Sequence, residues 1–520
     1  VSDTGSVAAS DLTTVASANS SGTLTATGVT TITGTVAEIE AAYGSGVVDD
    51  LSSVDNLGNE AITVTGTATV AEANRLDSLT TGTITATIST GDLTTLATLT
   101  GSPSAHAYTI TVTDTTAAAA DLNTVNGLTS VAIDGSAITT LSGTIAAVDT
   151  ALDAGVAGTI TGLGNEAVTL TDTSGVAVAT LNTLDGLTTG KINAGTITTM
   201  SGALTALNTA YASNGITGLG NEALTVSDTG SVAASDLNTL DTNTTGTVAA
   251  AGVSTITGTI SACNTAYGSA GISGLGDEAV TLTDTTGNAA DLNTLNNYTS
   301  GVVNAGTIST LTGTIADINT AFAADAAVSA TISGLGDQAV EINDTTVLAA
   351  DLNTLNGYTS ANVDASTVAV IEGTAAAINT VYDGKASSGD GISGLGNEAV
   401  TLTDTTVAAS ALTDLDSSAG TSGTIDASSV HTITGLIADA NTVYASSDFT
   451  GLGAENVTLT DTNNSSNGVS VSTLNTLNDY TTGNIDATTI SLLAGTAANL
   501  NTAYAAGSAT DDGISNLGNE

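Results

Sequence analysis

Apolar and polar residues alternate in short stretches of this chain, and the spacing then changes to a helical one. In the segment 280–284, Val-Thr-Leu-Thr-Asp, apolar and polar residues take turns, which is typical of a half-buried β-strand. Ile315, Ile318 and Phe322 lie three and four residues apart, which predicts one apolar face on a short helix. Gly313-Thr314 stands directly before that helix, and threonine is a common N-cap residue. Glycine-rich segments are expected to turn the chain between these elements.

This pattern recurs along the whole sequence. The string Gly-Leu-Gly-Asn-Glu-Ala returns with small changes, and a degenerate copy at 107–114 fills its one double-length gap. Nine repeats of roughly 58 residues result, a period typical of solenoids and arrays. The approximate repeats are 1–60, 61–106, 107–166, 167–222, 223–278, 279–338, 339–398, 399–455 and 456–520.

Each repeat divides into two similar halves. Asp-Leu-Asn-Thr-Leu at 291–295 aligns with Asp-Ile-Asn-Thr-Ala at 317–321, so the structural unit is a coil of roughly 28 residues. One coil cannot bury its own apolar face, but stacked coils bury leucine on leucine in a continuous column. We therefore predict a repeat solenoid of the β-solenoid class, with stacked parallel strands and one short helix per coil. Residues 1–12 are identical to 226–237, so we expect one continuous array taken from a longer chain.

Composition restricts the partners of this array. The chain has 51 Asp and Glu but only 3 Lys and Arg, a net charge of −48. Phosphate contacts need Lys and Arg, so neither a nucleic acid nor an anionic membrane surface is expected as a partner. A single cysteine allows no internal disulfide. No stretch of about 20 apolar residues is present, so no transmembrane helix is expected.

An asparagine in the Asp-Leu-Asn-Thr-Leu motif is the most regular polar residue. Its amide can donate and accept hydrogen bonds, so we expect it to bind backbone groups of its own and the next coil. A ligand site is the alternative interpretation. The members of this asparagine column are Asn123, Asn182, Asn208, Asn238, Asn264, Asn293, Asn319, Asn353, Asn379, Asn441, Asn475 and Asn501.

Acidic residues recur at two positions, in Thr-Asp-Thr and in the Gly-Asn-Glu turn. They are either caps of helices and turns or, together with Asn and turn carbonyl oxygens, ligands of Ca²⁺. The Gly-Gly-x-Gly-x-Asp nonapeptide of calcium β-rolls is absent, which favours capping, whereas the net charge favours a divalent cation. The calcium candidates, the only cofactor candidates, are Asp114, Asp172, Asp228, Asp284, Asp344, Asp404, Asp461, Glu166, Glu222, Glu278 and Glu398.

Aromatic residues end the helix in the second half of most repeats. Core packing is the simpler interpretation, and a platform that stacks on carbohydrate is the alternative. Because Phe322 replaces tyrosine in one repeat, the ring area is expected to matter more than the hydroxyl. The other members are Tyr43, Tyr211, Tyr267, Tyr382, Tyr444 and Tyr504.

Catalysis finds no support in the sequence, and the chain is not expected to be an enzyme. His106 and His431 lie in different repeats and are expected in surface loops. Cys263 stands where other repeats have isoleucine, so it is expected to fill the core. The carboxylates recur in nearly every coil, whereas an active site is normally unique.

The segments 349–360 and 394–406 resemble repeats of giant secreted cell-surface proteins of marine cyanobacteria, a family that includes a protein associated with swimming. The resemblance implies an extracellular or cell-surface location, a calcium-rich setting and a role in surface architecture, adhesion or motility. The segment 178–188 is similar to repeats of phage tail fibres.

Together these observations predict a structural protein of an extracellular fibre or a surface layer, an elongated acidic scaffold that associates with neighbouring copies. Glycans are further candidate partners. The first alternative is an adhesin or phage tail-fibre shaft that presents a binding tip. The second is ice binding by ranks of threonine in strands such as 281–283.

Overall fold

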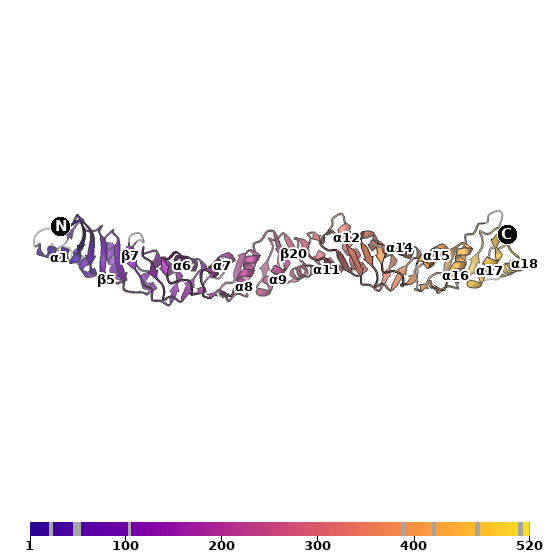
Figure 1. The fold of residues 1–520 in the computed structure, drawn as a ribbon, viewed down its shortest axis with the longest axis horizontal. Coiled ribbons are helices and arrows are strands. Elements are labelled where there is room, and N and C mark those ends of the chain that lie inside the picture. Colours follow the sequence, from indigo (N-terminus) through magenta and orange to yellow (C-terminus); the bar gives the residue numbers. More distant parts are fainter. Residues whose placement is uncertain are drawn as a thin grey trace. The chain divides into compact units, whose positions relative to one another are not determined.

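The computed structural model describes residues 1–19, 24–44, 54–101, 106–385, 391–418, 423–462, 468–507 and 513–518. Two compact units divide the chain. Unit 1 holds Val1–Thr229, Asp236–Val253 and Ala270–Gly274, and unit 2 holds Gly230–Ser235, Ser254–Ser269 and Leu275–Glu520. Each unit is built from coils in which parallel strands stack on one another and a short helix recurs (Figure 1). The prediction of a β-solenoid with one helix per coil is confirmed.

Helices recur once per coil in the described part of the chain. They are α1 Ala9–Ala18, α2 Val36–Ala42, α3 Val70–Leu79, α4 Leu93–Leu96, α5 Ala119–Asn126, α6 Ile145–Ala157, α7 Val178–Leu187, α8 Leu204–Ala212, α9 Ala234–Asn243, α10 Ile260–Gly268, α11 Ala289–Tyr298, α12 Ile315–Ala326, α13 Ala349–Tyr358, α14 Ala375–Asp383, α15 Ala409–Ser418, α16 Ile437–Ala445, α17 Val471–Tyr480 and α18 Ala497–Ala506.

In unit 1 the strands pair in parallel. One sheet joins β1 Gly5–Ala8, β3 Val29–Gly34, β5 Ala61–Ala68, β6 Ile84–Ile88 and β7 His106–Thr109. A second joins β8 Thr116–Ala118, β10 Thr140–Gly143, β12 Ala167–Leu170, β14 Ile192–Asn193 and β16 Ile216–Thr217. A third joins β13 Val176–Ala177, β15 Thr199–Gly202, β17 Ala223–Val226, β19 Val248–Ala249 and β21 Ile272–Ser273. The strand pairs are β2 Leu24–Thr25 with β4 Val54–Asp55, and β9 Ile133–Asp134 with β11 Ile160–Thr161.

Unit 2 has the same parallel pairing. Its first sheet joins β18 Ser231–Ala233, β20 Thr255–Gly258, β22 Ala279–Leu282, β24 Val303–Asn304 and β26 Ile332–Ser333. The next joins β23 Thr286–Asn288, β25 Thr310–Gly313, β27 Ala339–Ile342, β29 Asn362–Asp364 and β31 Gly391–Ser393. A third sheet joins β28 Thr346–Leu348, β30 Val370–Gly373, β32 Ala399–Leu402, β34 Ile425–Asp426 and β36 Phe449–Thr450. A fourth joins β33 Thr406–Ala408, β35 Thr432–Gly435, β37 Asn456–Leu459, β39 Asn484–Asp486 and β41 Gly513–Ser515. The strand β38 Val469–Ser470 pairs with β40 Leu493–Ala494.

The register of each sheet places like residues on like. Along the sheet from β18 to β26, the paired and buried residues are Val232, Ile256, Val280, Val303 and Ile332. The residue that follows each of them points to the opposite face, because side chains alternate along a strand. The core is therefore a column of aliphatic residues, as the stacking argument predicts.

The helices complete this core with their inner faces. In α12 the buried residues are Ile315, Ile318, Ala321 and Phe322, which includes the predicted apolar face. Thr314 is the N-cap residue, and its hydroxyl accepts the N–H of Asp317 at 3.2 Å. The predicted cap at the Gly-Thr step is thus confirmed for this helix.

Glycine allows the closest approach between some successive coils. A Cβ atom on Gly301 would lie 2.2 Å from the carbonyl oxygen of Glu278 in the preceding coil, and one on Gly246 would lie 2.2 Å from that of Glu222. Gly274 adopts a φ of +84°, a conformation that other residues rarely adopt. These contacts bring the backbones of successive coils together at the turns described next.

Within the described residues, no helix has the length and apolar character needed to cross a bilayer.

Candidate functional site

The recurring glutamate turn is built around a buried carboxylate. Glu278 is 1% exposed, and its Oε2 accepts the N–H of Gly276 at 2.8 Å. Glu222 makes the same bond to Gly220 and a second one to the N–H of Asn221 at 3.1 Å. Consecutive backbone N–H groups that point at one anionic atom form an anion-binding concavity, so the side chain closes its own turn. The same arrangement recurs at Glu60, Glu166, Glu398 and Glu455.

A tyrosine hydroxyl completes most of these turns. The hydroxyl of Tyr267, at the end of α10, donates to Oε2 of Glu278 at 3.0 Å. Burial, and after it the charge of Glu278, raise the pKa of Tyr267 above its usual value. Sequence reasoning missed this hydroxyl bond, and the expectation that ring area matters more than the hydroxyl stays a prediction. The equivalent pairs are Tyr43 with Glu60, Tyr211 with Glu222, Tyr382 with Glu398 and Tyr444 with Glu455.

In one repeat, both the tyrosine and the glutamate of this arrangement are replaced. Phe322 takes the place of tyrosine at this position of α12, and Gln338 takes the place of glutamate in the following turn. Gln338 is 2% exposed, and its Oε1 accepts the N–H groups of Gly336 and Asp337 at 2.6 and 3.2 Å. The turn keeps its backbone hydrogen bonds after both the charge and the hydroxyl have been replaced.

Among the described residues, a buried threonine ties most of these turns to the next coil. The hydroxyl of Thr299 donates to the carbonyl of Glu278 at 2.6 Å and accepts the N–H of Gly301 at 2.9 Å. Sequence reasoning missed this threonine column, although a threonine two residues before a glycine follows most first-half helices. Its members are Thr80, Thr129, Thr188, Thr244, Thr299, Thr359 and Thr481. Glu455 was also missed, because Ala454 replaces the asparagine of the motif.

The aspartate of Thr-Asp-Thr caps a helix of the preceding coil. Oδ2 of Asp284 accepts the N–H of Ile260, the first residue of α10, at 2.8 Å. This N–H has no partner inside its own helix, and a negative charge is favourable there. The other members make the same bond to the first residue of an earlier helix: Asp114 to Leu93, Asp172 to Ile145, Asp228 to Leu204, Asp344 to Ile315, Asp404 to Ala375 and Asp461 to Ile437.

The asparagine column connects neighbouring helices. Nδ2 of Asn293 in α11 donates to the carbonyl of Asp317 in the first turn of α12 at 2.9 Å. The same bond to the following helix is made by Asn123, Asn182, Asn208, Asn264, Asn319, Asn353, Asn379, Asn441 and Asn475. Asn238 occupies this position in α9, and Asn501 occupies it in α18, where it is exposed.

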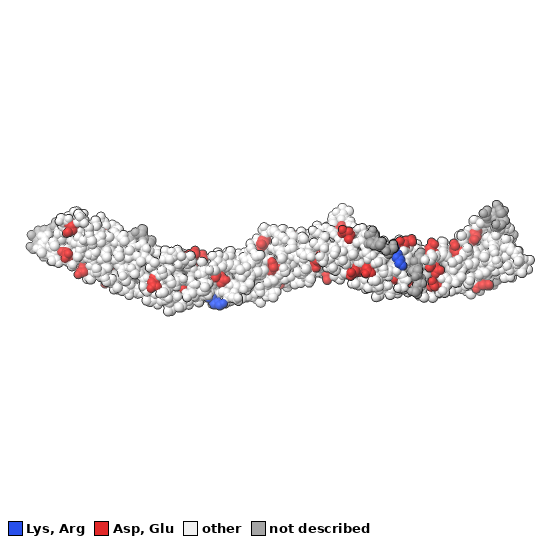
Figure 2. Space-filling model, viewed as in Figure 1, with Lys and Arg blue, Asp and Glu red and all other residues white. Residues whose placement is uncertain are grey.

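The two acidic columns do not gather into a cluster of carboxylates. Among the described residues, no group of three or more His, Cys, Asp or Glu side chains could hold a metal ion. Asp284 binds a helix end, and Oε2 of Glu278 binds its own turn. On the face shown in Figure 2, acidic side chains are scattered over both units rather than gathered in one patch. Calcium binding by these residues stays a prediction.

His106 is buried, so its expected place in a surface loop is wrong. It is 2% exposed, and its Nε2 lies 2.7 Å from Oδ1 of Asp77. Its Nδ1 accepts the N–H of Ile84 at 3.3 Å, which places the ring proton on the nitrogen that faces Asp77. His431 is exposed, as expected.

Cys263 belongs to α10, and its side chain is buried in the protein core, as predicted. Burial, assisted by the charge of Asp284, raises the pKa of the Cys263 thiol to about 12. The thiol is therefore protonated at neutral pH and lacks the thiolate character that reactive cysteines need.

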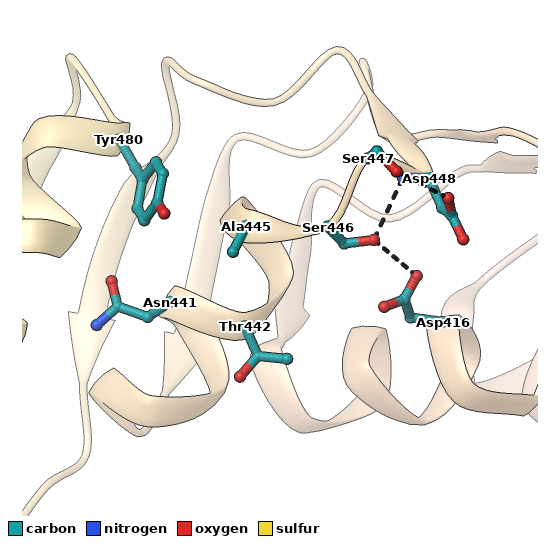
Figure 3. A pocket seen from close by; sticks show the side chains of 8 residues that line it. All are labelled: Asp416, Asn441, Thr442, Ala445, Ser446, Ser447, Asp448 and Tyr480. Carbon is teal, nitrogen blue, oxygen red and sulfur yellow. Dashed lines mark hydrogen bonds between the residues drawn. The ribbon is translucent and has the colours of Figure 1, made fainter.

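A polar pocket with one aromatic wall lies in unit 2 (Figure 3). Its volume is about 680 Å³, and Tyr480 stands on one side of it. Tyr480 is 38% exposed and stacks on Tyr444, with ring centroids 5.8 Å apart. On the other side, the hydroxyl of Ser446 donates to Asp416 at 2.9 Å. The other lining residues are Asn441, Thr442, Ala445, Ser447 and Asp448.

No protein-family model matches this chain, and no curated protein matches it.

Proposed function

We propose that this chain is a structural segment of an extracellular fibre or a cell-surface layer. The observation that supports the proposal is that the recurring polar residues form hydrogen bonds between successive coils. Asp284, Asn293 and Thr299 each bind the backbone of an adjacent coil. Their equivalents repeat along both units, so the most regular residues of the sequence serve to join coil to coil.

The acidic composition fits this role. With a net charge of −48, copies of the chain repel each other at low ionic strength, and salt or divalent cations reduce that repulsion. A scaffold of this kind suits a salty medium outside the cell. Neighbouring copies of the same protein are its proposed partners.

Labelling of intact cells tests the location. Antibodies against the purified repeats should label unpermeabilised cells of the producing organism, and external protease should remove the signal. A cytoplasmic protein of the same cells is the control and should stay unlabelled and intact. Labelling that requires permeabilised cells would contradict the proposal.

Glycan adhesion is a second candidate function, favoured by the pocket beside Tyr480. Its tyrosine ring is held by stacking on Tyr444, and an exposed aromatic ring beside polar groups can contact a sugar. A glycan array should then detect binding that Tyr480→Ala abolishes and Tyr504→Ala, at an exposed tyrosine outside the pocket, leaves intact. Equal binding by both variants would exclude this pocket.

Ice binding by threonine ranks such as 281–283 stays an alternative, although some other strand threonines use their hydroxyls inside the protein. Hydroxyls of strand threonines such as Thr257 and Thr217 donate to backbone carbonyls of the preceding coil. Those protons are used inside the protein rather than offered to water.

A further inference from the structure

The aromatic wall of the pocket in unit 2 is held in place by its neighbours. Tyr480 stacks on Tyr444, with ring centroids 5.8 Å apart and an angle of 11° between the ring planes. The hydroxyl of Tyr444 donates to Oε2 of the buried Glu455 at 3.0 Å, which fixes the supporting ring. Tyr480 itself is 38% exposed. Its ring is therefore a fixed and accessible contact surface on one side of the pocket (Figure 3).

The serine, threonine and asparagine side chains of the pocket donate hydrogen bonds to other groups of the protein. The hydroxyl of Ser446 donates to Oδ1 of Asp416 at 2.9 Å. The other bonds of this kind run from Ser447 to the carboxylate of Asp448, from Thr442 to the carbonyl of Ala438 and from Asn441 to the carbonyl of Thr473. Hydroxyl and carboxylate oxygens can still accept hydrogen bonds. The pocket is therefore suited to a ligand that brings donors of its own.

One of the two carboxylates stands where equivalent coils have glycine. In unit 1, Ser213 donates to Asp185 at 2.6 Å and accepts the N–H of Gly215 at 2.9 Å. A Cβ atom on Gly215 would collide with Oδ1 of Asp185, and Gly271 holds the same position beside Asp241. A side chain at this position therefore lies next to an acid of the preceding coil.

In the coil of the pocket, an aspartate takes the glycine position. Ser446 donates to Asp416 and accepts the N–H of Asp448 at 3.2 Å, as the serine of unit 1 does with its acid and its glycine. Asp416 and Asp448 lie at the same end of the pocket, across from Tyr480 (Figure 3), and their negative charges repel each other. Among the described residues, no Lys, Arg or His forms an ion pair with either carboxylate. A cationic group of a ligand would relieve this repulsion.

We propose that the pocket binds a saccharide with a free amino group, its ammonium beside Asp416 and Asp448 and its sugar ring against Tyr480. An ammonium has three donors and no acceptor, which matches the acceptors of the pocket, and a tyrosine face also attracts cations. A lysine side chain carries the same ammonium, but a pocket of about 680 Å³ has the size of a small-molecule site. An aromatic wall also suits the face of a sugar ring. The proposal rests on glycan binding at this pocket, the second candidate function.

The same charges predict which saccharides bind poorly. N-acetylation removes the positive charge of the amino group, so an N-acetylated sugar should bind more weakly than the free amine. A uronic acid adds a third carboxylate to the pocket and should bind least. Asp448 is then the residue that determines specificity, whereas Tyr480 contributes to the binding of any sugar.

Isothermal titration calorimetry on the full chain tests this specificity, at about 0.15 M salt to screen the general attraction of an acidic protein for cations. The probes are a glucosamine trisaccharide with one free and two acetylated amino groups, the same trisaccharide fully acetylated, and lysine with its α-amino and carboxyl groups blocked. The charged trisaccharide should bind about tenfold more tightly than the fully acetylated one, as expected for two partly exposed ion pairs. It should also bind more tightly than the blocked lysine, which lacks a sugar ring.

The outcomes separate this proposal from glycan binding itself. Equal affinities of the two trisaccharides would overturn the proposal and leave glycan binding at the pocket in place. No binding of either trisaccharide would overturn both. Blocked lysine that binds as tightly as the charged trisaccharide would overturn the assignment to a saccharide.

Variants of Asp448 test its role. Asp448→Gly restores the residue of the equivalent coils, and Asp448→Asn keeps the size but removes the charge. Each should reduce the preference for the charged trisaccharide to about threefold, because Asp416 remains. Asp277→Asn is the matched control, since it removes an exposed carboxylate outside the pocket and copies the natural Asn221, and it should keep the tenfold preference. Thermal melts followed by circular dichroism would show that the variants are folded, and a full preference retained in both Asp448 variants would overturn the proposal.

Discussion

The turns that end at Glu278 and Gln338 lie in successive repeats of unit 2, and two of their buried side chains differ together. Tyr267 and Glu278 form a hydrogen bond between a hydroxyl and a carboxylate, whereas Phe322 and Gln338 are both uncharged and lack that bond. The backbone bonds to the last side chain are kept in both. The turn therefore requires an acceptor for its own N–H groups, and the charge is a separate feature.

The turn at Glu166 sharpens this comparison. Leu152 occupies the aromatic position in α6, and Glu166 is nevertheless present and fully buried. The carboxylate therefore does not need the tyrosine hydroxyl. In α6 and α12, the residue at this position lacks a hydroxyl, and both helices are longer than α8 and α10. The helices α8 and α10 carry Tyr211 and Tyr267 at the same position.

Removal of the last side chain should have the largest effect. Glu278→Ala leaves the Gly276 N–H and the Tyr267 hydroxyl without their buried acceptor, and it should lower the free energy of unfolding by about 3 kcal/mol. Gln338→Ala should cost about 2 kcal/mol, because no tyrosine hydroxyl loses a partner. Urea denaturation followed by circular dichroism measures both. An equal loss in the two variants would show that the tyrosine bond contributes nothing.

The aspartate caps should be equivalent in the two repeats. Asp284 caps α10, which carries Tyr267, and Asp344 caps α12, which carries Phe322. Asp284→Ala and Asp344→Ala should each cost about 1.5 kcal/mol, within the range for the loss of a helix cap. The same denaturation experiment compares them. A clear inequality would mean that the repeats differ beyond their turns.

Removal or addition of the tyrosine hydroxyl alone should have a smaller effect on the free energy of unfolding. Tyr267→Phe removes one hydrogen bond to a carboxylate and should cost about 1 kcal/mol. Phe322→Tyr should give no gain beside Gln338 but should stabilise the chain once Gln338→Glu is present. A double-mutant cycle measures this coupling, and additive effects would refute it.

Alkaline pH should produce the smallest difference between the repeats. Burial, then the nearby Glu278, raise the pKa of Tyr267 above its usual value of 10.0. The protonated form is therefore favoured in the folded state, so this stabilisation is complete below about pH 10 and is lost as the pH rises further. The unfolding midpoint of Tyr267→Phe should fall less steeply above pH 10 than that of the wild type. Parallel pH profiles would exclude a contribution from this tyrosine.

The solenoid could be predicted from the sequence because the same local pattern is repeated many times. The face of Ile315, Ile318 and Phe322 and the core position of Cys263 follow from spacing alone. The partners of polar residues do not, since they depend on how coils stack. Asp284 suggests a cap, but the helix it caps begins 24 residues earlier. His106 appeared isolated because Asp77, its partner, is 29 residues away.

The direction of the aspartate caps also bears on how such a gene can change its length. Each aspartate of this column caps a helix of the coil before it, as Asp344 does for α12. Recombination that inserts or deletes a whole repeat restores every such pairing, because the new junction joins the same two kinds of coil. Loss of a single coil would join two coils of the same kind and separate a helix from its cap. The array is therefore expected to grow and shrink in whole repeats over evolution.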